Sequence, residues 1–394
     1  MRIRRHRLVA PARRAFGFSE WLSLQKVALK YLVRPDDPPY GGPAENLFAR
    51  EFCDYQGSSG SAKCVATGTL AVYAAIKALD LPSGSEMVIP PVTDGGAVSA
   101  ALVAGIRTRP CDSSPSSFNT NFEEIRQSLS PQTKAVMVAH IAGEPVADIK
   151  QIADYCKKND IRLIEDCSQA VGAEVEGVKV GNFGDVAAFS IMYRKNLSSG
   201  GSGGLVYTRR SELFNTILGV CDRGKQSWRL DLNQNDPSQS LFAALNLSWN
   251  EFSASVAASS LGRLDQTIVR RRYFTAALYE ATKPADICKP QSDARHWSPF
   301  FMPIHVDLKR ISVDKVQLTR ALTREGIGLL PQYGCVVSRW PWLAEASNQN
   351  FSLPNAETYA DNSFNLFLNE RYSAAYGREI ARVMRRTTQE FLLD

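Results

Sequence analysis

Strand-like and helix-like hydrophobic patterns alternate from about residue 45 to residue 210. In residues 147–158, Ile149, Ile152 and Cys156 are spaced i, i+3 and i+7, which places them on one face of a helix. Further helices are predicted over residues 70–79 and 95–105, and strands over 87–90, 135–141, 161–166, 186–191 and 203–208. The strand-like runs are almost continuously apolar, which is typical of a mainly parallel sheet with helices on both faces. This part of the chain therefore predicts an α/β domain.

The C-terminal part of the chain follows a different pattern. Residues 210–240 turn polar and predict a long surface excursion. The elements predicted after it are a helical stretch over 250–282, a strand over 300–308, and helices near 313–325 and 373–391. They indicate a smaller α+β domain. We expect an N-terminal arm and helix over residues 1–44, a large α/β domain over 45–265 and a small α+β domain over 266–394.

The composition is that of an ordinary globular protein. The chain has 394 residues, of which 44% are hydrophobic and 22% are charged. These values exclude a mainly disordered, collagen-like or coiled-coil chain. A chain of this length also buries a large core without help from disulfides or structural metals.

The net charge of +6 comes from one end of the chain. Six arginines lie within the first fourteen residues, where no acidic residue occurs, and they account for the whole excess. The rest of the chain is balanced, so the charge does not predict a nucleic-acid groove. The basic arm is interpreted as a solvated terminus, with contact to an anionic partner as the alternative.

Cysteine and histidine usage bears on redox compartment and metals. The eight cysteines are scattered without a C-x-x-C pair, which is typical of reduced thiols in a cytoplasmic protein. None of the four histidines has a metal-ligand spacing, so we expect no metal site. The longest uncharged apolar stretch, residues 95–106, is too short to cross a membrane.

Polar residues follow the carboxyl ends of the predicted strands, where open α/β sheets bind their ligands. One strand ends at Asp166, and the next contains Ser190 and precedes Lys195. Ala66–Thr69 precedes a helix, whose N-terminal N–H groups favour a phosphate. Pyridoxal phosphate (PLP) needs a lysine for its Schiff base, a carboxylate for its pyridine nitrogen and a phosphate cup. The combination therefore predicts PLP as the cofactor.

Taken singly, each of these features has an ordinary structural explanation. Asp166 alone is typical of a helix cap or strand end, Lys195 of a surface lysine, and Ala66–Thr69 of a helix start. Other cofactors match less well. The GSGG at residues 201–204 is not the G-x-G-x-x-G of nicotinamide enzymes, and the chain has no Walker-type phosphate loop.

The order and spacing of these segments resemble the DegT–StrS type of sugar aminotransferases, which are PLP-dependent enzymes of fold type I. That family has a phosphate-binding S-G-T-D-A-L segment, an E-D-x-x-Q-A-x-G-A strand end, a glycine-rich F-G-D segment and an F-S-F-x-x-x-K-N-L lysine segment. The corresponding stretches here are ATGTLAV, EDCSQAVGA, GVKVGNFGD and FSIMYRKNL. The resemblance is dense over residues 45–210 and continues more weakly to the C-terminus.

The resemblance implies catalytic roles for two residues. Lys195 forms the Schiff base with PLP and moves a proton between the substrate carbon and the cofactor carbon. Asp166 pairs with the pyridinium nitrogen and makes the ring an electron sink. Gln169 lies against the cofactor near its ring and hydroxyl group.

The resemblance also implies how the phosphate is held. Gly68, Thr69 and Ser190 bind it from within the chain. Asn246 matches an asparagine that reaches the phosphate from the other subunit. A homodimer with shared active sites is therefore expected.

Three positions depart from the family pattern. Asp94 occupies the position of an aromatic ring that stacks on the cofactor, so it is expected to hydrogen-bond cofactor or substrate, and Tyr193 is a second candidate to cover the ring. Ser248 stands where the family has an arginine, and Gln332 where it has a histidine. These changes leave the PLP prediction intact and indicate rearranged substrate contacts.

The function expected from the resemblance is transfer of an amino group from glutamate or glutamine to a nucleotide-linked keto sugar, by way of pyridoxamine phosphate. One alternative is a ketone without a nucleotide, such as a cyclitol or an antibiotic intermediate. A sugar dehydratase or other eliminase is a second, although family dehydratases replace the lysine by histidine. A PLP-binding regulatory homologue is a third, against which the Asp166–Lys195 pair argues.

Overall fold

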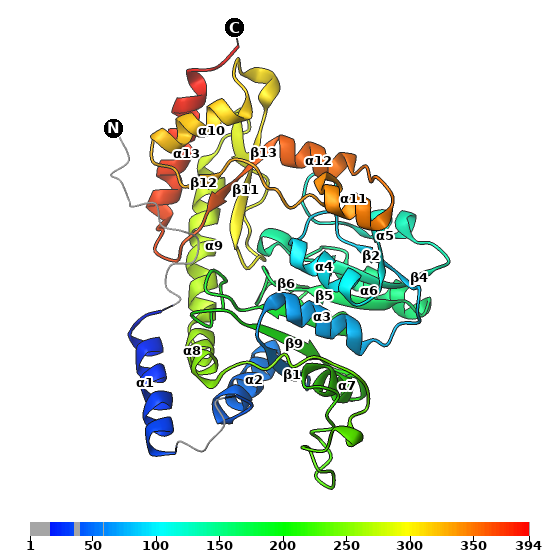
Figure 1. Cartoon of the computed structure of the whole chain (residues 1–394). Helices are drawn as coiled ribbons and strands as arrows, with labels where there is room; N and C mark the ends of the chain where they lie inside the picture. Colours follow the sequence, from blue (N-terminus) through cyan, green and yellow to red (C-terminus); the bar gives the residue numbers. More distant parts are fainter. Residues whose placement is uncertain (1–15, 35–39, 58, 394) are drawn as a thin grey trace.

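A seven-stranded mixed sheet is the largest element of the fold (Figure 1). The computed structural model describes residues 16–34, 40–57 and 59–393. In spatial order the strands are β1 (Ser61–Val65), β9 (Gly204–Thr208), β8 (Val186–Ser190), β5 (Arg162–Asp166), β4 (Thr133–Ala139), β2 (Glu86–Ile89) and β3 (Arg107–Pro110). The strands from β8 to β3 are parallel, whereas β9 runs antiparallel to both β8 and β1. The predicted mainly parallel sheet is confirmed.

Helices cover both faces of this sheet. On one face lie α3 (Gly68–Ala78), α4 (Gly95–Val103) and α7 (Ser211–Cys221), and on the other α2 (Pro43–Gln56), α5 (Phe122–Ser128), α6 (Ile149–Lys158) and α8 (Glu251–Leu261). In β2, Met87 and Ile89 pack toward the first group, whereas Val88 packs with α5 and α6. Because both sides of such a strand are buried, its sequence is apolar throughout.

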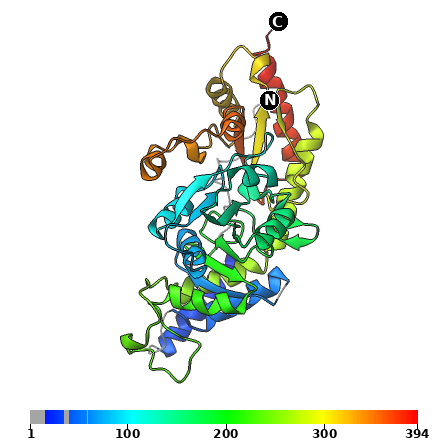
Figure 2. The ribbon, with the colours of Figure 1, turned by 90° about the vertical axis from the view of Figure 1, so that its right-hand side faces the viewer.

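A second, antiparallel sheet lies in the C-terminal part of the chain. Its order is β10 (Cys288–Pro290), β11 (Phe301–Val306), β13 (Ser363–Phe367) and β12 (Leu329–Leu330). The helices of this part are α9 (Leu264–Ala281), α10 (Lys315–Arg324), α11 (Pro341–Ser347), α12 (Pro354–Asp361) and α13 (Ala374–Gln389). Figures 1 and 2 show α13 beside α9, and the two helices pack together. The domain boundaries after residues 44 and 265 stay a prediction.

Smaller elements complete the described chain. They are α1 (Phe18–Val33), which packs on α8, and a hairpin of β6 (Glu174–Val175) and β7 (Val178–Lys179). All eight cysteines are unpaired and six are buried, which confirms the prediction of free thiols. Within the described residues, no helix has both the length and the apolar content needed to cross a membrane.

Two segments differ from the sequence-based predictions. The excursion predicted over residues 210–240 is wrong at its start, where the structure has α7. Leu213, Ile217 and Val220 give this helix an apolar stripe that packs into the core, and only the chain after it is irregular. The helical stretch predicted over 250–282 is two helices, because α8 ends at Leu261 and α9 begins at Leu264.

Candidate active site

A cavity of about 270 Å³ lies at the carboxyl ends of the parallel strands. Asp166 ends β5 and Ser190 ends β8, so both residues reach this edge of the sheet. The starts of α3 and α4 and the loops after the strands supply most of the remaining wall. Seven of the eight residues predicted from the sequence line this one cavity: Gly68, Thr69, Asp94, Asp166, Gln169, Ser190 and Lys195.

The N-terminus of α3 forms one end of the cavity. Thr67 caps the helix, because its Oγ1 accepts a hydrogen bond from the backbone N–H of Leu70 at 3.0 Å. A Cβ atom on the following residue, Gly68, would lie 2.6 Å from the Cβ of Ser190. Glycine therefore lets the helix begin this close to β8. The N–H groups of the first turn, with the hydroxyl groups of Thr69 and Ser190, are suited to a phosphate.

Asp166 is buried, and its Oδ1 accepts a hydrogen bond from the backbone N–H of Ser168 at 3.0 Å. Burial raises the pKa of this carboxyl group, while the hydrogen bond from Ser168 and the nearby charge of Lys195 act in the opposite direction. A cationic group that enters the cavity stabilises a buried carboxylate of this kind. The protonated nitrogen of a pyridine ring is such a group.

Lys195 lies in the turn after β8. Its backbone N–H donates to the carbonyl of Met192 at 2.9 Å, and its Nζ lies 4.7 Å from the centre of the Phe300 ring. Burial lowers the pKa of the amino group, whereas the charges of Asp166 and Asp94 raise it. A lower pKa increases the neutral fraction of the amine, which is the form that attacks an aldehyde.

Gln169 connects the large sheet to the C-terminal part of the chain. Its Oε1 accepts a hydrogen bond from the N–H of Ala142 at 2.9 Å, and its Nε2 donates to the hydroxyl of Tyr333 at 3.0 Å. Tyr333 also lines the cavity. Residues from both parts of the chain therefore close the site.

His140 lines the cavity too, and no motif in the sequence points to it. It follows β4 at the same edge of the sheet as Asp166, and that position is the one sequence signal for it. Its Nδ1 accepts from the N–H of Val146 at 3.0 Å, so its Nε2 carries the proton and donates to Glu165 at 3.1 Å. The imidazole is thus fixed in one tautomer.

His140, Glu165 and Cys167 place potential metal-ligand atoms within 4.8 Å of one another. Glu165 already accepts three backbone hydrogen bonds of 2.7–2.8 Å from residues 181–184, besides the one from His140. These bonds occupy its oxygen atoms, so the cluster is a buried hydrogen-bond network that holds the strand ends together. The absence of a metal site stays a prediction.

The sequence and the site agree with one family of enzymes. A model of the DegT/DnrJ/EryC1/StrS aminotransferase family matches residues 35–385. The chain belongs to this family. It is 32% identical over 342 residues to the L-glutamine:2-deoxy-scyllo-inosose aminotransferase of Streptomyces kanamyceticus, which covers 82% of this chain and 77% of that protein. A GDP-perosamine synthase of Vibrio cholerae is 30% identical over 229 residues, 57% of this chain and 59% of the synthase.

Solved structures share the fold at lower identity. Helicobacter pylori PseC, an aminotransferase involved in the biosynthesis of pseudoaminic acid, superposes with a TM-score of 0.86 over 97% of this chain and 99% of that one, at 18% identity. An E. coli GDP-4-keto-6-deoxy-D-mannose-3-dehydratase with bound hydrated PLP gives a TM-score of 0.83 over 95% of this chain and all of the other, at 20% identity. These likenesses confirm the predicted fold. The chain is an enzyme of a PLP-dependent aminotransferase family.

In this aminotransferase, Asp94 caps α4: its Oδ1 accepts a hydrogen bond from the N–H of Gly96 at 2.8 Å. Asp94 also lines the cavity. Tyr193, the other candidate to cover the cofactor, is 43% exposed and lies outside the lining residues. Among the described residues, the aromatic rings that line the cavity are those of His140 and Tyr333.

Asn246 is the one predicted residue that the structure does not bring to the cavity of its own chain. It lies on an exposed loop, where its Oδ1 accepts a hydrogen bond from the N–H of Ser248 at 3.0 Å. Its role in the site of a second subunit stays a prediction.

The groups around the cavity fit PLP. The N-terminus of α3 suits the phosphate, the buried carboxylate of Asp166 suits the pyridine nitrogen, and the amino group of Lys195 suits the aldehyde. Thr67, Gly68 and Thr69, where the helix begins, line the cavity together with Ser190. The residues present therefore match the cofactor of the family.

Proposed function

We propose that this protein is a PLP-dependent aminotransferase that moves an amino group from glutamate or glutamine to a cyclic polyhydroxylated ketone. One observation carries the proposal: the buried carboxylate of Asp166 and the amino group of Lys195 border one cavity, and the N-terminus of α3 lies at its end. The family of the chain and the 32% identity to an L-glutamine-dependent cyclitol aminotransferase support it.

The residues of the cavity would have separate roles in the reaction. When bound, PLP supplies an electron sink and carries the amino group between the two substrates. Asp166 holds a proton on the pyridine nitrogen, since a buried carboxylate stabilises the cation. Lys195 Nζ takes a proton from the carbon of the amino donor and returns one to the carbon of the acceptor. The ring of Phe300 packs against Nζ and limits its contact with water.

The acceptor that these observations favour is a ketone without a nucleotide. Among the described residues that line the cavity, Lys195 is the single cationic side chain, so this chain offers little to a diphosphate. Ser248 and Gln332, in place of an arginine and a histidine, also favour an acceptor without a nucleotide. A nucleotide-linked keto sugar is the second candidate, supported by the 30% identity to GDP-perosamine synthase.

We also propose a homodimer in which Asn246 of each subunit completes the other subunit's site. The loop that carries Asn246 exposes Leu241, Phe242 and Leu245 at 51%, 39% and 53%. Exposed apolar side chains so close together are typical of an interaction surface. The free thiols of the chain support a cytoplasmic location.

The absorption spectrum of the purified protein tests the cofactor and the donor. We expect a visible band from lysine-bound PLP that disappears when glutamate or glutamine is added, as the cofactor takes up the amino group. A band that does not change when either glutamate or glutamine is added would contradict the proposed donors. A protein that acquires no band after addition of PLP would contradict the proposed cofactor.

Two variants test the residue roles. Lys195→Ala should bind PLP without the visible lysine-bound band and lose transamination, and Asp166→Ala should keep its fold and lose nearly all turnover. Transamination by Lys195→Ala would refute the role of Lys195. The aminated enzyme is then incubated with a cyclitol ketone and, separately, with a nucleotide-linked keto sugar. The acceptor that is used restores the visible band of lysine-bound PLP.

A further inference from the structure

A second cavity, of about 390 Å³, has Glu144 in its lining, three residues after Ile141, which lines the candidate active site. Its sides are the loop 114–121 after β3, residues 144–148 before α6, part of the connection from β10 to β11, and Tyr359 on α12. It is larger than the candidate active site and contains none of the residues that line it. None of the chemistry described so far uses it.

Hydroxyl and amide groups dominate the lining of this second cavity. They include Ser114, Ser117, Asn119, Thr120, Gln291 and Ser292. Trp297 and Tyr359 add aromatic surface with polar tips. Such a mixture of hydroxyls, amides and ring faces matches a ligand with several hydroxyl groups.

The lining of this second cavity offers acidic groups and no basic ones among its described residues. Glu144 and Asp148 contribute carboxylates, and no lysine or arginine occurs among the described residues that line the cavity. A phosphate or carboxylate ligand would meet like charge here, whereas an ammonium group would meet opposite charge. The lining therefore selects against phosphorylated sugars and nucleotides.

Glu144 has an oxygen atom to offer such a ligand. Its Oε2 accepts hydrogen bonds from Ser117 Oγ at 2.6 Å and from Asn119 Nδ2 at 3.4 Å. Within the described part of the chain, its Oε1 makes no hydrogen bond. Burial raises the pKa of the Glu144 carboxyl group to about 7. Glu144 is half-buried, so this unused oxygen atom is open to a cationic donor, which would also favour the charged form of the carboxyl group.

We propose that this second cavity binds a small polyhydroxylated molecule that carries an ammonium group, with Glu144 as the partner of the ammonium group. The hydroxyl and amide side chains of the loop 114–121 and of the β10–β11 connection bind its hydroxyl groups. An amino sugar or an aminocyclitol belongs to this chemical class.

Hydrogen bonds of residues 141–144 link the lining of the second cavity to residues of the active site. Asn119 accepts a hydrogen bond from the N–H of Ile141 at 2.8 Å and donates to the carbonyl of Glu144 at 3.0 Å. Between them, Ala142 donates to Gln169 and accepts from the N–H of Phe300, the residue whose ring covers Lys195. A ligand held by Glu144 therefore contacts a segment in which Ala142, two residues earlier, positions Gln169 and Phe300.

Isothermal titration calorimetry with glucosamine as the probe tests the proposal. We expect glucosamine to bind the wild-type protein, and glucose and glucosamine 6-phosphate to bind more weakly, because one lacks the ammonium group and the other adds a repelled phosphate. Glu144→Gln should weaken glucosamine binding about tenfold or more, the effect of losing a charged hydrogen-bond partner. Asp154→Asn, which removes an exposed carboxylate from α6, is the matched control and should bind as the wild type does.

Two further variants locate the binding. Ala147→Phe adds a ring at the exposed rim of the second cavity and should also weaken glucosamine binding, whereas Lys195→Ala should not. The absence of binding heat in the wild type would overturn the proposal. Wild-type affinity for glucosamine in both Glu144→Gln and Ala147→Phe would also overturn it. Loss of binding in Lys195→Ala would overturn it as well, because it would place glucosamine in the active site. Because none of these titrations depends on transamination, failure here is distinct from failure of the proposed function.

Discussion

At the scale of single residues, Gly68 shows how the absence of a side chain shapes the candidate phosphate site. A Cβ atom would lie 2.6 Å from the Cβ of Ser190, so α3 would have to move away from β8. We expect Gly68→Ala to weaken PLP binding, because overpacking, which usually costs about 1–3 kcal/mol, opposes the position of α3 that suits the phosphate. Titration of the protein with PLP, followed by the visible absorption band, measures the change.

Gly201→Ala is the control for this substitution. Gly201 lies in the same glycine-rich neighbourhood after the lysine turn, and a Cβ atom there would meet no atom within 4 Å. The affinity of the Gly201→Ala variant for PLP should equal that of the wild type. Equal affinities for all three proteins would show that the approach of Gly68 to Ser190 is not needed.

The residues of the site divide into those that the sequence predicts and those that it does not. Gly68, Asp166 and Lys195 stand in short segments directly after strands or before a helix, so local pattern places them at one sheet edge. Phe300 and Tyr333 reach the site from the second sheet, and their position depends on how the two sheets dock. No local pattern encodes that docking.

At the scale of elements, a buried arginine ties α9 to the turn that carries Lys195. Arg271 is 1% exposed, and its Nη1 donates to Asn196 Oδ1 at 2.5 Å and to the carbonyl of Pro299 at 3.0 Å. Asn196, the neighbour of Lys195, donates in turn to Ser298 Oγ at 2.9 Å. The lysine turn is thereby fixed to α9 and to the residues just before Phe300.

We expect Arg271→Met to lower the free energy of unfolding by roughly 3–5 kcal/mol, because it leaves Glu370 buried without its cation, 3.7 Å away in the wild type. Thermal unfolding measures this loss. Arg270→Met, one residue earlier on the exposed side of the same helix, should change stability by less than about 0.5 kcal/mol. Equal melting temperatures for the two variants would refute the role of the buried network.

Elements differ in how far the sequence predicts them. The parallel strands are visible as apolar runs because both their faces are buried. In β13, by contrast, Ser363 and Asn365 are buried at 2% exposure each, so an inner strand of the second sheet carries polar residues where the pattern expects apolar ones. Hydropathy alone does not reveal such a strand.

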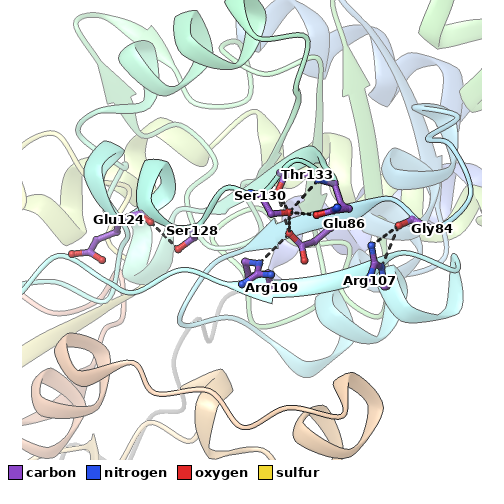
Figure 3. Close-up of polar contacts among 9 residues, drawn as sticks. Gly84, Glu86, Arg107, Arg109, Glu124, Ser128, Ser130 and Thr133 are labelled. Atoms are coloured by element: carbon purple, nitrogen blue, oxygen red, sulfur yellow. Dashed lines mark hydrogen bonds and ion pairs between the residues drawn. The ribbon is translucent and has the colours of Figure 1, made fainter.

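At the amino ends of the parallel strands, Glu86 joins β2 to β3 and β4 (Figure 3). Its carboxylate accepts hydrogen bonds from Arg109 Nε at 3.0 Å, Ser130 Oγ at 2.7 Å and Thr133 Oγ1 at 3.1 Å. Burial alone raises the pKa of this group, but the hydrogen bonds outweigh it and hold the pKa below the usual 4.5. Glu86 therefore stabilises the fold above that pH and loses this effect as the pH falls through its folded-state pKa.

We expect Glu86→Gln to lower the melting temperature at pH 7 and to approach the wild type as the pH falls below about 4.5, where the wild type loses its advantage. Melting curves between neutral and acid pH measure the difference. Glu345→Gln, at an exposed position, should show no such convergence. A difference for Glu86→Gln that is the same at every pH would contradict the lowered pKa.

At the scale of the whole molecule, Tyr333 of the C-terminal part joins residues of the large sheet in the lining of the cavity. The N–H of Thr93 donates to the carbonyl of Cys335 at 3.0 Å, and that of Val337 donates to the carbonyl of Pro91 at 3.0 Å. These bonds fix the segment with Tyr333 to the loop that leads to Asp94. The wall of the site therefore depends on both parts of the chain, whichever boundary separates them.

The position of Asn246, outside the lining of its own chain's cavity, leads to the last prediction. If it completes the partner's site, Lys195→Ala and Asn246→Ala should each lose activity, yet a mixed dimer should regain it, because one of its two sites then carries both changes and the other carries neither. Random reassociation of equal amounts makes half of the dimers mixed, so about a quarter of wild-type activity should return. Separate affinity tags on the two variants allow the mixed dimer to be isolated and assayed. If Asn246 instead acted within its own subunit, both sites of the mixed dimer would carry one lesion each, and the isolated mixed dimer would stay inactive.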